Sequence, residues 1–240
     1  MIFLGKVLIK AFPHDTIFIQ ERVLKYEQGD VNLKNYVQII NQLLDEKIVA
    51  ILRVDHPEKA KKGIAAMKKG GLKNIEVTLN TPGALDVISA YSNDEDMMIG
   101  AGTVLDEAAC QAAIQHGANY IVTPTLNESV IKCANRYQKP VICGCFTPTE
   151  MQQAMELGVN MIKAFPASEM SYDAISAIKG PLHYALIGPT GGVTLSNIKI
   201  WEEAGADFYG IAGEFCTLTN QEKYDELEEV AARYVDALRR

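Results

Sequence analysis

The sequence predicts an α/β fold, a TIM (β/α)8 barrel with an extra N-terminal helix. Eight short apolar runs alternate with segments of helical period from residue 48 to the C-terminus. Four joins repeat one pattern, a glycine at a helix end and a strand soon after it: "KKGGLKNIEV", "QHGANYIVT", "ELGVNMIKA" and "EAGADFYGI". A doubly wound open sheet is the main alternative, but that fold more often has about five or six strands and a Gly-rich fingerprint after the first. The segment "VDHPEKA" lacks this fingerprint, which favours the closed barrel.

The predicted elements follow one another in a regular order. An amphipathic helix, "NLKNYVQIINQLLDEK", comes first, with apolar residues along one face. Capping residues or prolines open several later helices, as in "DHPE" and "TPTE". A last amphipathic helix is predicted over 221–240. The eight predicted strands between these two helices are the runs 48–54, 74–79, 97–104, 120–125, 140–146, 161–167, 184–192 and 208–215.

We expect two parts, an N-terminal extension over residues 1–30 and a single barrel domain over 31–240, because no linker interrupts the barrel pattern. The opening segment has too weak a basic start, and lacks the small-residue cleavage site, that a secretory signal requires. Two explanations of the extension stay open. Either the start codon is misassigned and the natural product begins at Val31, or the segment is a strand or arm that packs on a partner subunit.

Composition excludes several classes of protein. A net charge of −7 and an isoelectric point near 5.2 argue against a partner in nucleic acid or a membrane surface. No apolar run approaches the roughly 20 residues that a membrane span needs. The five cysteines are odd in number and lie mostly in apolar stretches, which indicates a reducing cytoplasm rather than disulfides. Cys143 and Cys145 have no histidine nearby, so no metal site is expected.

Polar residues inside the predicted strands carry the functional signal. Side chains of a barrel strand alternate between the interior and the helix layer. Lys163 therefore shares a face with Met161 and Phe165 in the sixth strand, as Glu76 does with Asn80 in the second. The active site of such a barrel lies at the carboxyl ends of its strands. The inward-facing set predicted to converge there is Arg53, Glu76, Asn80, Thr103, Thr123, Thr125, Lys163 and Thr190.

A lysine and a glutamate inside one barrel can be explained in two ways. They can form a structural ion pair, or they can be catalytic groups. Burial favours the uncharged form of an amine, which is then a nucleophile suited to forming a Schiff base with a carbonyl. Glu76, screened from water, suits general acid–base catalysis. The four histidines fall in loops, helices or the N-terminal segment, which argues against a metal-dependent barrel.

The segment "GPTGGVTLSN" (188–197) predicts an anion site. Gly191 and Gly192 allow backbone N–H groups to approach a phosphate, and a helix starting near Ser196 would add the positive end of its dipole. Phosphate sites often follow strands seven and eight of this fold. A plain tight turn is the alternative explanation.

With these residues identified, the chain resembles the 2-dehydro-3-deoxy-phosphogluconate (KDPG) aldolase family, which includes the 4-hydroxy-2-oxoglutarate (KHG) aldolases. The resemblance runs from about Ile48 to the C-terminus. The motifs that carry it, in order, are "VAILR", "GGLKNIEVTLNTP", "IGAGTVL", "IVTPTL", "CGCFTPTE", "IKAFPA" and "PTGGV".

The resemblance implies a cytoplasmic, homotrimeric TIM barrel and a class I aldolase that needs no cofactor. Its substrate would be a small keto acid, in a pathway such as the Entner–Doudoroff pathway. The implied catalytic residues are Lys163, as the Schiff-base lysine, and Glu76, as the proton shuttle. The implied substrate ligands are Arg53 and Thr103 on the carboxylate, Phe165 as a pocket wall, and Thr125, Thr190, Gly191, Gly192 and Gly213, the last four toward the distal phosphate.

Three departures from the family pattern bear on the substrate. Asn80 stands where some members have arginine, and "VTLNTP" also resembles the relatives that cleave phosphogalactonate. Gly213 stands where a serine often contacts phosphate, and Glu214 beside it adds a negative charge. Cys143 replaces a common proline. The predicted main substrate is KDPG, cleaved to pyruvate and glyceraldehyde 3-phosphate, with KHG as a second substrate. An enzyme specific for KHG or for the phosphogalactonate is the alternative, and a non-catalytic binding barrel is a further one.

Overall fold

The computed structural model describes residues 36–238 of the chain. The predicted N-terminal extension, residues 1–30, and the first four residues of the predicted first helix lie outside the described residues. That helix is seen as α2 (Tyr36–Glu46), which precedes the first strand. The predicted helix before the barrel is therefore present over its described part.

Eight parallel strands form one sheet in the order β7-β6-β5-β4-β3-β2-β1-β8. Thr190 and Gly210 form a parallel bridge, and the Asp207 N–H donates to the Ile187 carbonyl at 2.9 Å, which closes the ring between β7 and β8. The predicted closed barrel is confirmed. The strands are β1 (Ile48–Leu52), β2 (Asn74–Thr78), β3 (Met98–Gly102), β4 (Tyr120–Thr123), β5 (Val141–Cys145), β6 (Met161–Ala164), β7 (Leu186–Pro189) and β8 (Tyr209–Ile211).

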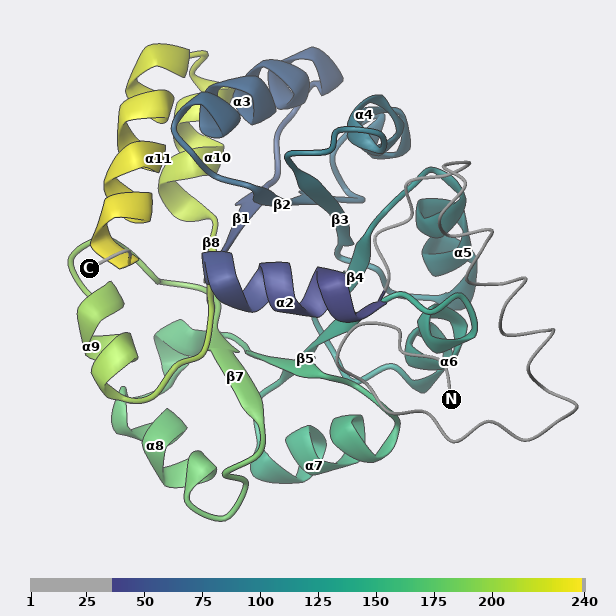
Figure 1. The fold of residues 1–240 in the computed structure, drawn as a ribbon, viewed down its shortest axis with the longest axis vertical. Coiled ribbons are helices and arrows are strands. Elements are labelled where there is room, and N and C mark those ends of the chain that lie inside the picture. The colour runs from purple at the N-terminus through teal and green to yellow at the C-terminus, as the bar shows by residue number, and fades with distance from the viewer. Residues whose placement is uncertain (1–35, 239–240) are drawn as a thin grey trace, which may run out of the picture. The chain divides into compact units, whose positions relative to one another are not determined.

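Helices follow the strands and surround the barrel, while α2 crosses one end of it (Figure 1). Local capping explains where several begin. The Asp106 side chain accepts from the Ala109 N–H, and Thr147 and Glu150 form a capping box. The helices are α3 (Pro57–Lys69), α4 (Ala84–Tyr91), α5 (Glu107–Gln115), α6 (Glu128–Arg136), α7 (Pro148–Glu156), α8 (Asp173–Lys179), α9 (Ile198–Glu203), α10 (Gly213–Asn220) and α11 (Tyr224–Leu238), with a 3₁₀ turn at Ala167–Glu169.

The eighth strand is shorter than the run 208–215 that the sequence predicts. It ends at Ile211, and the helix α10 begins two residues later at Gly213. Phe215 continues the apolar pattern because it is buried between α10 and its neighbours, not because it belongs to the strand. An apolar run thus spans a strand and the first turn of the next helix.

The buried apolar residues form two separate cores. The outer core lies between the sheet and the helices and includes Ile75, Ile121 and Ile162. The inner core fills the barrel at the end covered by α2, and its members are Ile39, Leu43, Val49, Met98, Tyr120, Val122, Ile142, Met161 and Phe208. Membership of these cores therefore identifies which residues of each strand point into the barrel.

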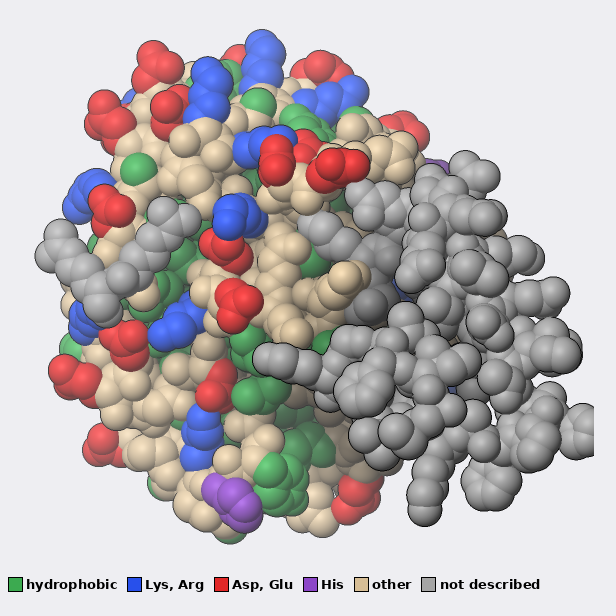
Figure 2. All heavy atoms as spheres, in the orientation of Figure 1, with side chains coloured by type: hydrophobic (Ala, Val, Ile, Leu, Met, Phe, Trp, Pro, Cys, Tyr) green, Lys and Arg blue, Asp and Glu red, His purple; other side chains and the backbone are tan. Residues whose placement is uncertain are grey.

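Charges of both signs are interspersed on the face of the described part shown in Figure 2. Lys–Glu and Lys–Asp pairs cover the helices, such as Lys61 with Glu58 at 2.8 Å. Within residues 36–238, no helix is both long and apolar enough to cross a membrane.

Candidate active site

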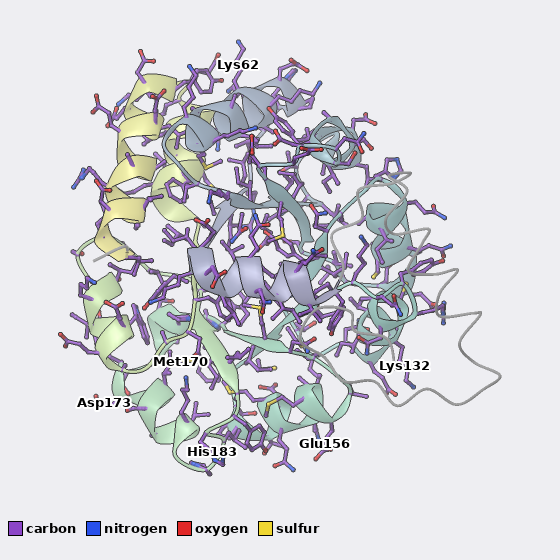
Figure 3. All side chains as sticks on the ribbon, in the orientation of Figure 1. Lys62, Lys132, Glu156, Met170, Asp173 and His183 are labelled. Atoms are coloured by element: carbon purple, nitrogen blue, oxygen red, sulfur yellow. The ribbon has the colours of Figure 1, made fainter. Side chains whose placement is uncertain are left out.

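Lys163 lies on the inner face of β6, with only 7% of its surface exposed. Its neighbour two residues earlier, Met161, belongs to the inner core. The strands on both sides place a glycine directly opposite it, Gly144 in β5 and Gly188 in β7. Neither neighbour places a side chain beside Lys163; the Pro124 backbone lies over Gly144, and the Phe208 ring lies over Gly188. By contrast, Lys62 and Lys132 lie on outer helices at the periphery (Figure 3).

Glu76 lies on the inner face of β2 and is 2% exposed. Its side chain lies across Gly102 of β3, where there is no room for a Cβ atom. Burial raises the pKa of the Glu76 carboxyl, and the positive charges of Lys163 and Arg53 offset part of that effect. A buried carboxyl with a raised pKa can both hold and release a proton near neutral pH.

Lys163 and Glu76 do not form an ion pair. Among residues 36–238, no carboxylate oxygen lies within the 4.0 Å of the Lys163 Nζ that defines a salt bridge. The Nζ atom instead lies 5.0 Å from the centre of the Phe165 ring. The two groups interact across a gap inside the same barrel. This arrangement supports the catalytic explanation over a structural ion pair, since a buried pair needs close contact to offset its desolvation.

Arg53 and Thr103 follow β1 and β3 at the carboxyl end of the barrel. Arg53 is exposed, and its charge acts on the buried Glu76 carboxyl. Thr103 has a backbone φ of 56°, in the left-handed region that β-branched residues rarely adopt. Such strain persists only where surrounding contacts hold it, and it is common at functional sites. A cation and a strained hydroxyl residue beside Glu76 suit binding of a carboxylate.

The turn after β7 has the backbone shape of an anion site. Gly191 and Gly192 have φ values of 93° and 80°, which glycine adopts without strain. The Phe165 ring lies near Gly191, at 3.8 Å from the position of a Cβ atom. Asn197 holds the turn in place, because its Nδ2 donates to the Gly192 carbonyl and its Oδ1 accepts from Thr194, both at 2.8 Å. Successive N–H groups in such a turn can bind a phosphate.

Two helices follow the last two strands, and the second of them is the longer. The helix α9 begins at Ile198, two residues after the predicted start near Ser196, and has only six residues. A longer helix, α10, begins at Gly213, where a Cβ atom would meet open space. Glu214 is turned away from the barrel, since the Tyr234 hydroxyl of α11 donates to its Oε2 at 2.6 Å. The negative charge that counted against phosphate is thus directed toward α11.

The predicted inward-facing set is wrong at one member. Thr123 shares its face with Ile121 of the outer core and pairs with Cys143 of the same core, so it points toward the helices. Its hydroxyl donates to the Thr125 carbonyl at 2.9 Å and so shapes the loop after β4. Asn80 and Thr125 lie exposed on loops after β2 and β4. Cys143, one of the departures from the family pattern, also lies in the outer core.

Three features were missed in the sequence analysis. The glycines beside Lys163 follow from strand register, which one sequence does not give. Tyr120 lies in the inner core, and alternation from Val122 would have found it. Ser168, in the turn after β6, has its Cβ 3.3 Å from the place where a Cβ of Gly192 would lie, and only this tertiary contact reveals it.

His183 lies at the outer edge of the barrel (Figure 3). In the described part of the chain, His, Cys, Asp and Glu do not group as three or more metal ligands.

Comparison with known proteins shows the family to which this chain belongs. The family model "KDPG and KHG aldolase" matches residues 39–231. The chain is 34% identical over 164 residues to the 2-dehydro-3-deoxy-phosphogluconate aldolase of Haemophilus influenzae, covering 68% of this chain and 77% of that protein. It is 32% identical over 197 residues to the 2-dehydro-3-deoxy-6-phosphogalactonate aldolase of Escherichia coli, covering 80% and 94%.

A solved structure matches at a similar level. It is a cube-shaped, porous protein cage designed by fusing symmetric oligomeric domains, with a TM-score of 0.76 and 32% identity. The match covers 80% of this chain and 72% of that one. The resemblance noted in the sequence and the predicted enzyme class, a carbon–carbon lyase of the class I aldolase type, are confirmed. The chain belongs to the KDPG and KHG aldolase family.

Proposed function

We propose that this aldolase uses Lys163 and Glu76 to cleave KDPG to pyruvate and glyceraldehyde 3-phosphate, and KHG to pyruvate and glyoxylate. The observation that carries the proposal is the buried, unpaired amine of Lys163 in the same barrel as the Glu76 carboxyl, whose pKa is raised by burial. Lysine without a carboxylate partner is free to react with a carbonyl.

The first half of the reaction forms the Schiff base. The Lys163 amine attacks the C2 ketone, and a carbinolamine results. The Glu76 carboxyl gives a proton to the departing C2 oxygen, which leaves as water, and an iminium ion remains.

The second half breaks the C3–C4 bond. The Glu76 carboxylate removes the proton of the C4 hydroxyl, C4 becomes the carbonyl carbon of the aldehyde, and the bonding electrons move into the iminium to give an enamine. Glu76 then returns the proton to C3. Water hydrolyses the resulting iminium and releases pyruvate and free Lys163. One carboxyl at this depth can do all these steps because burial holds its pKa above the usual range.

The two ends of the substrate would be held by different loops. Arg53 and Thr103 would bind the carboxylate next to the reacting ketone. The turn Thr190–Gly191–Gly192 and the N–H of Gly213 would bind the phosphate at the far end, and Phe165 would lie between. The exposed Thr125 would lie at the rim.

Borohydride reduction in the presence of pyruvate tests the covalent step. Reduction should leave a stable pyruvate-derived adduct on the peptide that contains Lys163, found by mass spectrometry. Lys139→Met is the matched control, because Lys139 is also partly buried but precedes β5 at the other end of the barrel. Trapping should survive in that variant and disappear in Lys163→Met. An adduct elsewhere, or none, would reject Lys163 as the Schiff-base residue.

A second candidate substrate set is favoured by the residue at position 213. Gly213 offers no hydroxyl, so the far-end group has one side-chain donor fewer. The alternative is an enzyme selective for KHG or for the phosphogalactonate. Comparing kcat/KM for KDPG, its galactonate epimer and KHG decides between these possibilities. Equal values with and without phosphate would reject the assigned phosphate site.

We further propose that the protein is a cytoplasmic homotrimer of the Entner–Doudoroff pathway, with residues 31–240 as the catalytic domain. The related cage built from symmetric oligomeric domains supports an oligomer. Exposed apolar side chains such as Leu105 and Phe146 provide contact surface, and all five cysteines are free. Native mass spectrometry should give three copies per particle and identify the first residue of the natural chain. A monomer would reject the trimer.

A further inference from the structure

Tyr120 is a buried polar residue that the mechanism so far leaves without a role. It begins β4, points into the barrel and is completely buried. Its hydroxyl has no hydrogen-bond partner among the described residues. A buried hydroxyl without a partner is costly, and most such groups in native proteins are satisfied by protein or by internal water. A phenylalanine would fill the same space without this cost, so the hydroxyl needs an explanation.

The Tyr120 hydroxyl lies close to Glu76 because both side chains cover the same strand. The far end of the Tyr120 ring occupies the space above Gly100 of β3. The Glu76 carboxyl occupies the space above Gly102, two residues further on the same face. Two residues of a strand span about 6.6 Å. The Glu76 charge also contributes to raising the pKa of Tyr120, after burial as the main cause.

One internal water between the Tyr120 hydroxyl and the Glu76 carboxyl would give both groups a hydrogen-bond partner. The two side chains interact electrostatically, yet the hydroxyl makes no direct hydrogen bond to the carboxyl. A buried water needs two to four polar partners, and the hydroxyl and the carboxyl oxygen supply two. Gly100 and Gly102 have no side chains, so the inner face of β3 accommodates the Tyr120 ring and the Glu76 carboxyl side by side.

We propose that Tyr120 is a positioning residue for Glu76, whose hydroxyl donates through one internal water to the carboxyl and keeps it turned toward the substrate. The inference rests on the proposed function and deepens it. Tyr120 does not touch the substrate in this arrangement. It fixes the orientation of the group that moves the proton between C4 and C3.

The proposal has a consequence for pH dependence. A hydrogen bond that reaches the carboxylate stabilises its charged form and therefore lowers its pKa. Among the described residues, the other groups that act on Glu76 are Lys163 from β6, Arg53 just after β1 and the Cys216 thiol from α10. None of these is altered by removing the Tyr120 hydroxyl. Without that hydroxyl, burial should raise the Glu76 pKa further. The rate of the proton transfers that need the Glu76 carboxylate should then reach its maximum only at a higher pH.

The test compares Tyr120→Phe with Tyr209→Phe. Tyr209 is a matched control, since its hydroxyl is also buried without a partner among the described residues but faces the outer core from β8. The readout is exchange of the pyruvate methyl protons with deuterated water, followed by NMR, which reports enamine formation and needs no phosphorylated substrate. Melting temperature and borohydride trapping are measured for both variants.

The expected result is a loss of exchange rate in Tyr120→Phe of about tenfold, the scale of one hydrogen bond to a charged group. Its acid limb should move to higher pH, while trapping remains and Tyr209→Phe behaves as the parent protein. Unchanged exchange and pH profile, or an equal loss in both variants, would overturn the positioning role. If the parent protein fails to trap pyruvate, the proposed function fails as well, which separates the two outcomes.

Discussion

The two halves of the barrel interior differ in chemistry although the same strands build both. In β6, Met161 packs into the inner core, and Lys163, two residues later on the same face, lies in the half of the barrel that we propose as the active site. The half covered by α2 is mainly apolar, with Asn74 as a buried polar residue that donates to the Gln42 carbonyl of α2, whereas the half at the carboxyl ends holds Glu76, Lys163 and Thr190. Two residues on one face of the same strand can therefore lie in different environments, one apolar and packed, the other beside charged groups.

This difference supports a role for the apolar half in the proposed active site. The helix α2 closes the barrel from below by burying Ile39 and Leu43 completely. Water cannot reach Lys163 and Glu76 from that side, so both groups are desolvated even though the other end is open to substrate. The raised pKa of Glu76 is the measurable result of this burial.

The largest effect is expected for Lys163→Met. Cleavage should become undetectable, because Lys163 is the buried lysine of residues 36–238 and carries the proposed covalent step, while the melting temperature stays equal or rises since a costly buried amine is removed. Coupled detection of pyruvate and thermal unfolding measure the two quantities. Lys139→Met should retain full activity. Near-normal cleavage by Lys163→Met would show that the polar half of the barrel does not carry the covalent step.

A smaller loss is expected for Glu76→Gln. The amide keeps the shape of the side chain but cannot carry protons, so kcat should fall by about 10²- to 10⁴-fold, the usual contribution of general acid–base catalysis. Steady-state kinetics with KDPG measure this change. Binding of pyruvate as a covalent adduct should slow but still occur. A fall of less than about threefold in kcat would show that another group moves the proton.

The role of the half covered by α2 is tested by Leu43→Ala. Removing a completely buried leucine should destabilise the fold by about 2–5 kcal/mol, because the side chain leaves a cavity in the inner core. Urea denaturation measures the free energy of unfolding, and kcat should remain within about twofold below the transition. Val37→Ala, on the same helix but 62% exposed, should change stability by less than about 0.5 kcal/mol. Equal effects would argue against α2 as the closure of the barrel.

Most of this architecture could be predicted from the sequence because periodicity and parity are local properties. Met161, Lys163 and Phe165 alternate with Ile162 and Ala164, and that pattern alone places the lysine inside the barrel. The inward assignment of Thr123 was wrong although β4 alternates regularly, because its inward residues are Tyr120 and Val122 and Thr123 lies on the other face. A polar side chain at a strand end is not by itself a sign of an inward position.

Contacts between distant segments could not be predicted in this way. The direction of Glu214 depends on Tyr234 of α11, twenty residues later in the chain. The glycines opposite Lys163 depend on the register of three strands. Such features arise from tertiary packing, so one sequence carries no local signal for them.

Stability as a function of pH sharpens the comparison further. The folded-state pKa of Glu76 is raised, so its contribution to stability is complete at acidic pH and is lost as the pH rises through that value. Glu76→Gln should therefore gain stability over the parent protein between acidic and neutral pH. Glu150→Gln is the opposite control. Backbone N–H groups of Thr147 and Phe146 lower the pKa of Glu150, so its contribution is lost on acidification. Denaturation at several pH values measures both differences, and trends of the same sign would contradict the assigned environments.

The smallest effect concerns the far end of the substrate, at Gly213. Serine fits there because a Cβ atom meets open space, and its hydroxyl would face the proposed phosphate beside the N-terminus of α10. Gly213→Ser should lower KM for KDPG by about fivefold, the scale of one additional hydrogen bond, and leave KM for KHG unchanged. Gly213→Ala separates the hydroxyl from the effect of a side chain on the helix, and it should not improve KM. If the serine lowers KM for both substrates equally, the phosphate does not bind at the N-terminus of α10. The substrate site would then not extend from Lys163 as far as Gly213.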